Sequence, residues 1–177
     1  SGGVECDVVP TDVFDIIHTT YRPISMVIDA PISLDEKNYG SRKYPLINVY
    51  NSLSQRYSVM QSFDLMDQYQ QTQGFTYDYV IRIRFDWAIQ SPITVSELDP
   101  AAVYVPDDCP HPNGINDQFG IGNVENMRVY CHLFDHIESV FDQGISFCDE
   151  LLLQKHLENH SIPINRMRIP YHLQRKV

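Results

Sequence analysis

The sequence predicts one α/β domain over residues 1–177, with a mostly parallel or mixed central sheet flanked by helices. Short runs rich in β-branched and aromatic residues alternate with longer amphipathic stretches, as strands alternate with helices in such folds. The chain is 43% hydrophobic, and its 177 residues suffice for one core but hardly for two. It contains no internal repeat and no low-complexity tract that would favour another architecture.

The first elements are expected to be two strands. Residues 12–23, DVFDIIHTTYRP, are typical of a short buried strand that ends near His18, with Pro23 closing the next loop. Residues 24–31, ISMVIDAP, are a second candidate strand. Residues 33–47 are polar and contain a glycine and a proline, so we expect a long loop there.

A long amphipathic helix is predicted at about residues 53–73. Ser52 and Gln55 have the spacing of a capping box, in which each side chain bonds a free backbone N–H group. Gly74 is suited to end the helix because glycine readily adopts the left-handed conformation. Apolar residues at intervals of three or four predict one buried stripe, formed by Leu53, Tyr57, Met60, Phe63, Met66 and Tyr69.

The second half continues the alternation. Residues 77–90, YDYVIRIRFDWAIQ, and 101–106, AAVYVP, are predicted strands, and 107–116 form a turn-rich loop. Residues 117–123 are expected to be a strand that runs into a helix capped by Asn123. The buried stripe of that helix consists of Met127, Tyr130, Phe134, Ile137 and Phe141.

The last two elements are a helix and an extended segment. The helix is predicted from near Ser146 to about His160, with Asp149 completing a second capping-box pattern. The extended segment covers residues 164–175, INRMRIPYHLQR. These elements complete the alternation on which the α/β prediction rests.

Charge and cysteine content limit the function classes. The net charge of −10 and the pI of about 4.9 argue against general nucleic-acid binding, which requires a basic surface. A small anionic ligand would need local arginines or a metal ion acting against this field. Four cysteines without a CxxC pair favour reduced thiols over disulfides or a zinc site, so we expect a cytoplasmic location. We find no signal-peptide pattern, and no run of about 18 apolar residues predicts a membrane span.

The predicted strand at 77–90 carries charged side chains on one face. Arg82, Arg84 and Asp86 stand two residues apart. The alternate residues are apolar and fit a covered face: Ile81, Ile83 and Phe85. One interpretation of the charges is a buried ion-pair ladder. The other is that the carboxyl end of the strand opens into a cleft, where the ligands of open α/β sheets bind.

Five segments, in this order, resemble the GT-A-fold glycosyltransferases: DVFDIIHT, SLSQRYSVMQSFDLM, YDYVIRIRFD, NDQFGIGNVENMRVY and CDELLLQKHL. GFTYDYVIRIRFDWAI is similar to the central strand of that fold, where an apolar strand ends in a DxD-type acidic motif. The resemblance covers most of the chain beyond residue 10, and more specifically points to such domains in large DNA viruses and bacteria that build surface glycans. It implies transfer of a sugar from a nucleotide-sugar donor to a glycan hydroxyl acceptor.

Two features depart from the family pattern. The first βα unit, whose loop cradles the nucleotide base in the family, is short or absent here. Arg84 stands where the motif has its first acid, so Asp86 is the remaining carboxylate. A cation at this position would partly offset the charge of a diphosphate.

The resemblance implies roles for several side chains. Asp86 would lie beside the donor diphosphate and a Mn²⁺ or Mg²⁺ ion. His172 would be a second metal ligand, although a lone histidine is more often an ordinary residue. Arg82 or Arg84 would orient Asp86 or offset phosphate charge. His18 would face the nucleotide, unless it merely ends its strand.

Further roles concern the sugar and the base. Asp117 and Gln118 would hold sugar hydroxyls, or else belong to an Asx-type turn in their loop. The general base that deprotonates the acceptor would be Asp149 or Glu150, and Asp117 competes for that role. The alternative for the two acids at the helix start is stabilisation of the helix dipole.

Two other functions stay open. One is a non-catalytic module that binds a glycan or nucleotide sugar within a larger enzyme, which the short first unit and the reduced acidic motif favour. The other is a sugar nucleotidyltransferase, which shares the sheet topology but would need a Gly-rich phosphate loop that we do not find near the N-terminus. Release of nucleoside diphosphate, pyrophosphate or neither would distinguish the three.

Overall fold

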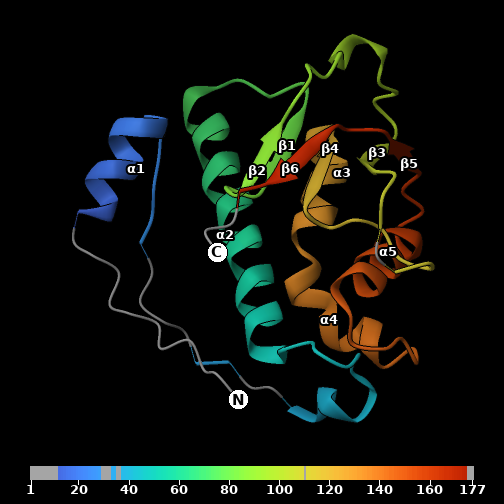
Figure 1. Ribbon diagram of the computed structural model, residues 1–177. Helices are drawn as coiled ribbons and strands as arrows, with labels where there is room; N and C mark the ends of the chain where they lie inside the picture. The colour runs from blue at the N-terminus through green and yellow to red at the C-terminus, as the bar shows by residue number, and fades with distance from the viewer. Residues whose placement is uncertain (1–11, 29–32, 35–36, 110, 175–177) are drawn as a thin grey trace. The chain divides into compact units, whose positions relative to one another are not determined.

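The computed structural model describes residues 12–28, 33–34, 37–109 and 111–174. The chain divides into two compact units, Ser1–Pro31 and Ile32–Val177. Five α-helices and six β-strands occur in the described residues, so the α/β class is confirmed (Figure 1). Within this part of the chain, every helix lacks the combination of length and apolar character needed to cross a membrane.

The first unit holds a helix where a strand was expected. Helix α1, Val13–Tyr21, shows that the strand prediction for 12–23 is wrong. The apolar residues of this run also fit helical spacing, and a strand needs a neighbouring strand, which the described residues of this unit do not supply. Arg22 follows in the left-handed conformation. Of the second predicted strand, 24–28 form no strand and 29–31 lie outside the described residues.

The long helix of the second unit, α2, Val49–Gln73, is confirmed, but it begins earlier than predicted. Asn48 caps it by accepting a backbone N–H at 3.0 Å. Ser52 therefore lies inside the helix and is not the cap that its spacing suggested. Gly74 ends the helix with a φ of 71°, as predicted.

The central sheet is mixed rather than mostly parallel. In the order β1-β4-β3-β5, strands β1 and β3 pair antiparallel with β4, whereas β3 pairs parallel with β5. The turn-rich loop returns the chain directly from β3 into β4 and makes them antiparallel, whereas helices intervene before β5. The bounds are Val80–Ile83 for β1, Val103–Pro106 for β3, Phe119–Gly122 for β4 and Ile164–Met167 for β5.

The continuous strand predicted at 77–90 is wrong, because a turn divides it into two strands. The second part, β2, Trp87–Ile89, leaves the central sheet and pairs antiparallel with β6, Tyr171–Leu173. The Trp87 N–H group bonds the Arg84 carbonyl at 3.1 Å and closes the turn. The charged residues after β1 therefore lie in a turn at the end of the strand.

The helix expected after Asn123 is two helices, α3, Val124–Cys131, and α4, Leu133–Phe141. Asn123 caps α3 as predicted, accepting a backbone N–H at 2.7 Å. The break falls at His132, whose ψ of 18° departs from α-helical geometry.

Helix α5, Asp149–Asn159, confirms the third predicted helix with a later start. Cys148 precedes it without a side-chain capping bond, and Asp149 bonds α2 instead, so the predicted capping box is wrong. Two 3₁₀ helices complete the described elements: η1, Lys37–Arg42, in the predicted loop at 33–47, and η2, Val95–Glu97.

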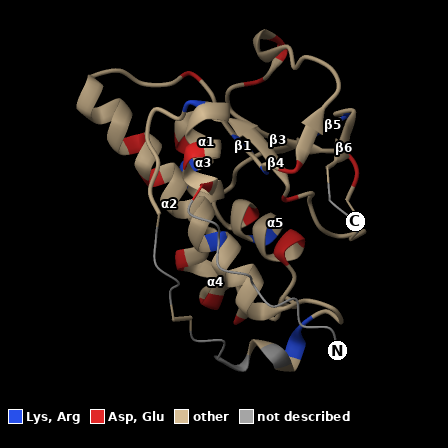
Figure 2. Cartoon of the chain, turned by 60° about the vertical axis from the view of Figure 1, so that its left-hand side comes forward, with Lys and Arg blue, Asp and Glu red and all other residues tan. Residues whose placement is uncertain are grey.

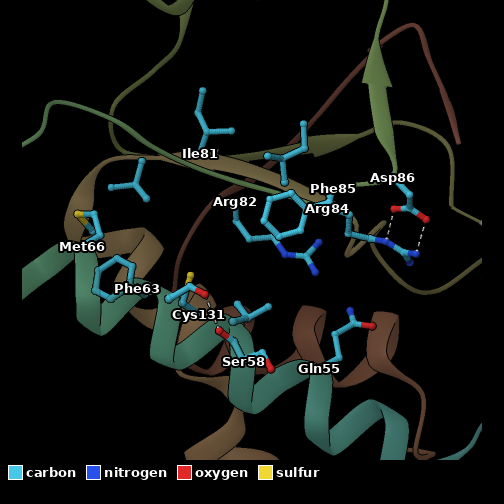
Figure 3. Close-up of a pocket in the computed structure, with 14 residues that line it drawn as sticks. Gln55, Ser58, Phe63, Met66, Ile81, Arg82, Arg84, Phe85, Asp86 and Cys131 are labelled. Atoms are coloured by element: carbon cyan, nitrogen blue, oxygen red, sulfur yellow. Dashed lines mark hydrogen bonds and ion pairs between the residues drawn. The ribbon is translucent and has the colours of Figure 1, made fainter. Parts of the chain in front are cut away.

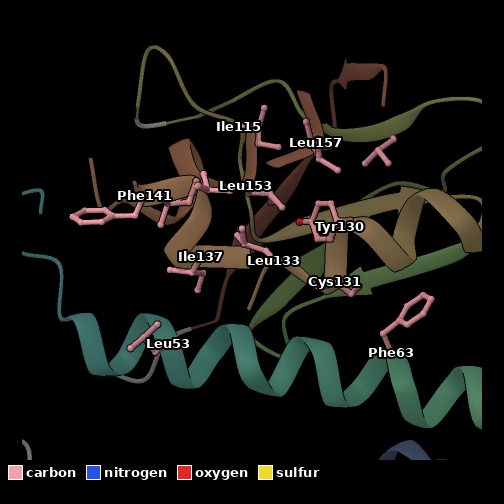
Figure 4. Packing of buried hydrophobic residues seen from close by; sticks show 14 of the residues in the cluster. Leu53, Phe63, Ile115, Tyr130, Cys131, Leu133, Ile137, Phe141, Leu153 and Leu157 are labelled. Carbon is pink, nitrogen blue, oxygen red and sulfur yellow. The ribbon is translucent and has the colours of Figure 1, made fainter. Parts of the chain in front are cut away.

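Helices α2 to α5 pack together against one face of the sheet. The main core lies among them and includes Tyr130, Leu133, Leu153 and Leu157 (Figure 4). A smaller core on the other face joins Phe119 and Ile121 of β4 to Trp87. Ile81 and Ile83 pair with these β4 residues, yet they are 48% and 43% exposed, so the expected covering of their face is wrong.

Gly120 lets β4 approach α3 closely. A Cβ atom at this position would lie 2.9 Å from ring atoms of Tyr130. The Tyr130 hydroxyl in turn donates to the Asp117 carbonyl at 3.3 Å. This close contact therefore helps to fix the residues that precede β4, which belong to the site described next.

Candidate functional site

A groove of about 720 Å³ lies between α2 and β1. Its apolar end is formed by Phe63 and Met66 of α2 (Figure 3) and by Val80 of β1. Its polar end is formed by Gln55, Arg84 and Asp86 (Figure 3). Apolar and polar surfaces within one groove suit a ligand that carries both kinds of group.

Arg82 extends from β1 toward α2 between these two ends (Figure 3). Its Nη1 donates to the carbonyl oxygen of Asp117. Its guanidinium forms no ion pair with any carboxylate in the described part of the chain. Acidic side chains occur along α2, α4 and α5 (Figure 2), and the net charge is −10. An arginine without a carboxylate partner in such a protein is therefore a candidate site for an anionic ligand group.

Arg84 and Asp86 form a bidentate ion pair in the turn after β1. Nε and Nη2 of Arg84 donate to the two carboxylate oxygens at 2.8 and 2.7 Å. The two side chains keep 31% and 24% of their surface exposed. Phe85 between them is 81% exposed, against the covering that we expected. The structure thus brings the three predicted charged residues to one groove, although they do not share one strand face.

A second charged group adjoins the groove through Gln55. This group, the Arg56 cluster, consists of Arg56, Asp117 and Asp149. Arg56 Nη2 donates to Asp117 at 2.6 Å, and its Nε donates to Asp149 at 2.8 Å. Gln55 adds a bond to Asp117 at 3.2 Å, and Ser52 adds one to Asp149 at 2.6 Å. Two of the three predicted bases are thus held by one surface of α2, and neither lines the groove.

Arg56 is almost fully buried, with 1% of its surface exposed. Burial by itself lowers the pKa of its guanidinium, but the carboxylates of Asp149 and Asp117 outweigh burial, so the pKa is raised and the group stays charged. Its Nη1 has no hydrogen-bond partner within the described residues. Removal of one partner from such a cluster leaves a buried charge unpaired, which is strongly destabilising.

Asn116 and Gln118 build the turn before β4. The Gln118 N–H group bonds Asn116 Oδ1 at 2.9 Å, which is the Asx-type turn considered as an alternative for this segment. The side-chain oxygen of Gln118 accepts from Trp87 Nε1 at 2.9 Å. Gln118 therefore has a structural role, and its side-chain amide nitrogen donates to no described residue.

Glu150, the third predicted base, lies against Cys148 and Gly114 and does not line the groove. The Cys148 thiol donates to its carboxylate at 2.8 Å. Burial, and then this hydrogen bond, raise the pKa of the thiol to about 12. A Cβ atom at Gly114 would lie 2.7 Å from the Cβ of Glu150, so only glycine fits this approach.

The predicted metal ligands do not form a ready site. His172 lies opposite Ala88 in the β2–β6 pair, and its Nδ1 accepts from the Gln90 amide at 3.2 Å. The Asp86 carboxylate bonds the neighbouring arginine. Over the residues that the structure describes, no group of three His, Cys, Asp or Glu side chains is placed to hold a metal ion. His18 is an exposed residue of the first unit.

Arg56 is the residue that sequence interpretation missed. It falls in the buried stripe of α2, between Leu53 and Met60. A charged residue at a buried helical position needs a buried partner, so its place in the stripe is a signal that can be read from the sequence. Ser58 and Ser62, which were also missed, line the groove from the same helix.

Comparison with known proteins supplies a family but no activity. No curated protein and no solved structure matched the chain. Residues 47–176 match a family described as a domain of unknown function, DUF7796. The matched region contains α2, the central sheet, the groove and the Arg56 cluster. Because the match covers more than half of the chain, the protein belongs to the DUF7796 family.

Proposed function

We propose that the protein is a GT-A-like glycosyltransferase that transfers a sugar from a nucleotide-sugar donor to a glycan hydroxyl, with the donor lying in the α2–β1 groove. The observation that carries this proposal is Arg82, whose guanidinium enters the groove without a carboxylate partner among the described residues. Guanidinium groups stabilise phosphate oxygens by charge-assisted hydrogen bonds. The resemblance of five segments to GT-A-fold enzymes supports the same assignment.

The groove offers a different environment to each part of such a donor. Arg82 would bond the diphosphate, with Arg84 adding positive charge from the polar end. Gln55 and Ser58 supply donors and acceptors suited to sugar hydroxyls. The apolar end around Phe63 suits the flat face of a nucleobase. Each part of the ligand would therefore meet surface of matching chemistry.

The base would be one of the three predicted acids, and Glu150 is the one whose partner is weakest. Arg56 holds both Asp117 and Asp149 through charged hydrogen bonds. Glu150 instead accepts a bond from the thiol of Cys148, and a thiol is a weak donor. Among the described residues, Glu150 thus lacks the charged partner that the other two acids have, which favours it for the role of base.

A Mn²⁺ or Mg²⁺ ion is implied by the resemblance, but the described side chains do not fit a preformed site for it. Both Asp86 oxygens accept from Arg84, and His172 bonds Gln90. The arginines would therefore offset the diphosphate charge. Tight metal binding only together with donor phosphates stays a prediction, which calorimetric titration of Mn²⁺ with and without nucleoside diphosphate tests.

A non-catalytic module that binds nucleotide sugars is the second candidate. The Arg56 cluster favours it, because this cluster engages two of the three predicted bases in structural contacts. In this case the groove would bind the same donor, and the sugar would stay on its nucleotide.

A nucleotide-sugar screen followed by product analysis tests these candidates. At least one nucleotide sugar should raise the melting temperature, because a ligand that prefers the folded state stabilises it. A transferase should then release nucleoside diphosphate, a nucleotidyltransferase pyrophosphate, and a binding module neither. Arg82→Met should abolish the shift. Arg42→Met is the matched control, because Arg42 also donates to a backbone carbonyl, that of Phe141, and does not line the groove. If no nucleotide sugar shifts the wild type and none is turned over, the proposal is wrong.

A further inference from the structure

We propose that Arg56 is a positioning residue that keeps Arg82 available to an anionic ligand by occupying the carboxylate of Asp117. This inference rests on the proposed function, because it concerns ligand binding in the same groove. Arg56 itself is 1% exposed and does not line the groove. It therefore acts through Asp117 and not by contact with the ligand.

Asp117 connects the two arginines. Its carboxylate accepts from Arg56 Nη2 at 2.6 Å and from Gln55 at 3.2 Å. Its carbonyl oxygen accepts from Arg82 Nη1 and from the Tyr130 hydroxyl. The groove arginine is thus hydrogen-bonded to the residue whose carboxylate Arg56 holds.

The distribution of charge explains why Arg82 has no carboxylate partner among the described residues. Arg56 and Arg82 contribute two positive charges, and Asp117 and Asp149 contribute two negative charges. Arg56 pairs with both carboxylates, so Arg82 has a neutral carbonyl as its partner. If Arg56 were absent, the Asp117 carboxylate, whose side chain is only 10% exposed, would need a new cation. Arg82 already contacts this residue and would turn away from the groove to pair with it.

Asp149 supports the same arrangement from the other side. It accepts from Arg56 Nε at 2.8 Å and from the Ser52 hydroxyl at 2.6 Å. Because the guanidinium is a rigid planar fork, a fixed Nε direction also fixes the direction of Nη2 toward Asp117. Asp149 thereby orients the Arg56 fork, a role distinct from that of a base.

Calorimetric titration with inorganic pyrophosphate at low ionic strength tests this inference. Arg56→Met should weaken pyrophosphate binding about tenfold. Adding Asp117→Asn to Arg56→Met should restore most of the affinity, because the freed carboxylate that competes for Arg82 is gone. Arg56→Lys should bind more tightly than Arg56→Met but less tightly than the wild type, because it keeps a positive charge near Asp117 but lacks the fork that bonds Asp117 and Asp149 together. It serves as a second variant if Arg56→Met folds poorly. Arg42→Met should leave the affinity unchanged, because Arg42 bonds the Phe141 carbonyl and does not line the groove.

The outcomes separate this inference from the proposed function. Equal affinity of the wild type and Arg56→Met, with binding lost in Arg82→Met, would overturn the role of Arg56 and leave the proposed function standing. If Arg56→Met loses pyrophosphate affinity and the added Asp117→Asn does not restore it, the role of Arg56 is also wrong, because a general distortion of the groove gives that result. If the wild type does not bind pyrophosphate, or if Arg82→Met binds it equally well, both the role of Arg56 and the proposed function are wrong.

Discussion

The Arg56 cluster and the Arg84–Asp86 pair are both arginine–carboxylate groups of the second unit, yet they differ sharply in burial. The Arg56 side chain is 1% exposed, whereas that of Arg84 is 31% exposed. Breaking a buried pair leaves a charge with neither partner nor water, whereas an exposed pair contributes only about 0–1 kcal/mol. The Arg56 cluster is therefore required for the stability of the fold, whereas the Arg84–Asp86 pair can rearrange around a ligand.

An acid at the end of a helix or strand is therefore not by itself a catalytic group. Asp149 begins α5 and Asp86 follows β1, so both occupy positions where functional acids are found. Asp149 is fixed by two donors from α2, whereas Asp86 lines the groove. The partners of each acid, and not its place in the sequence, distinguish support from ligand contact.

The largest expected effect is on stability and comes from the buried group. Arg56→Met should lower the free energy of unfolding by about 3–5 kcal/mol, because it removes the buried cation that Asp117 and Asp149 share. Arg84→Met should lower it by less than about 1 kcal/mol, because the pair that it breaks is exposed. Urea unfolding of both variants measures the difference. Equal losses would mean that burial does not separate the two groups.

A pH dependence extends the comparison to histidines. His156 is 1% exposed, and the rings of His136 and His160 contact it at centroid distances of 4.9 and 4.6 Å. Burial is the main cause that lowers its pKa from 6.5 to about 4, and the neighbouring histidines add to the shift. Between about pH 6.5 and 4, His156 therefore binds a proton in the unfolded chain but not in the folded protein. Stability contributed by neutral His156 should be complete above about pH 6.5 and fall by about 3 kcal/mol as pH drops to about 4.

Urea unfolding at several pH values between 7.5 and 4 measures this loss in the wild type and in His156→Leu. The variant lacks the buried imidazole, so its stability should fall less over the same range. His136→Leu is the control, because His136 is exposed and should leave most of the dependence in place. The account of His156 is wrong if wild type and His156→Leu lose stability in parallel.

Gly120→Ala tests the close contact between Gly120 of β4 and the Tyr130 ring of α3. The added methyl group would overlap the Tyr130 ring, so we expect a loss of about 1–3 kcal/mol in the free energy of unfolding. Gly122→Ala is the neighbouring control, because its Cβ atom would meet no atom closer than 3.3 Å. The free energy of unfolding is measured by thermal or urea unfolding. A larger loss for Gly122→Ala than for Gly120→Ala would contradict the packing of Gly120 against Tyr130.

The smallest stability effect is expected at Asp86. Asp86→Asn should cost less than about 1 kcal/mol, because its ion pair is partly exposed. The same variant should lose transfer or donor hydrolysis, because its carboxylate lines the groove. Asp64→Asn is the control: Asp64 is also a partly exposed acid, but it lies on α2 and pairs with His132 at 3.1 Å. A folded Asp86→Asn protein with full activity would remove Asp86 from the active site.

Local signals predicted several elements well. The apolar stripe with Gly74 after it identified α2, and Asn123 identified the start of α3, because caps and left-handed ends depend on neighbouring residues alone. The strand prediction for 12–23 failed, because a short apolar run fits either structure and its partners decide. The division of the strand at 77–90 was likewise set by distant pairing of β2 with β6.

The candidate site was predictable only in part. Strand alternation drew attention to Arg82, Arg84 and Asp86, and all three line the groove. The partners of Asp117 and Asp149 could not be predicted, because they come from a helix about 60 and 90 residues away along the chain. Sequence spacing carries no information about such long-range contacts.

Calorimetric titration of nucleoside diphosphates tests whether Arg82 makes the groove a site for the diphosphate of a nucleotide sugar. The measurement compares uridine and guanosine diphosphates with the corresponding nucleosides, for the wild type and for Arg82→Met. We predict that the wild type binds at least one diphosphate and binds its nucleoside far more weakly, and that Arg82→Met loses this preference. Wild-type protein that binds neither diphosphate, or Arg82→Met protein that binds as tightly as the wild type, would contradict the account.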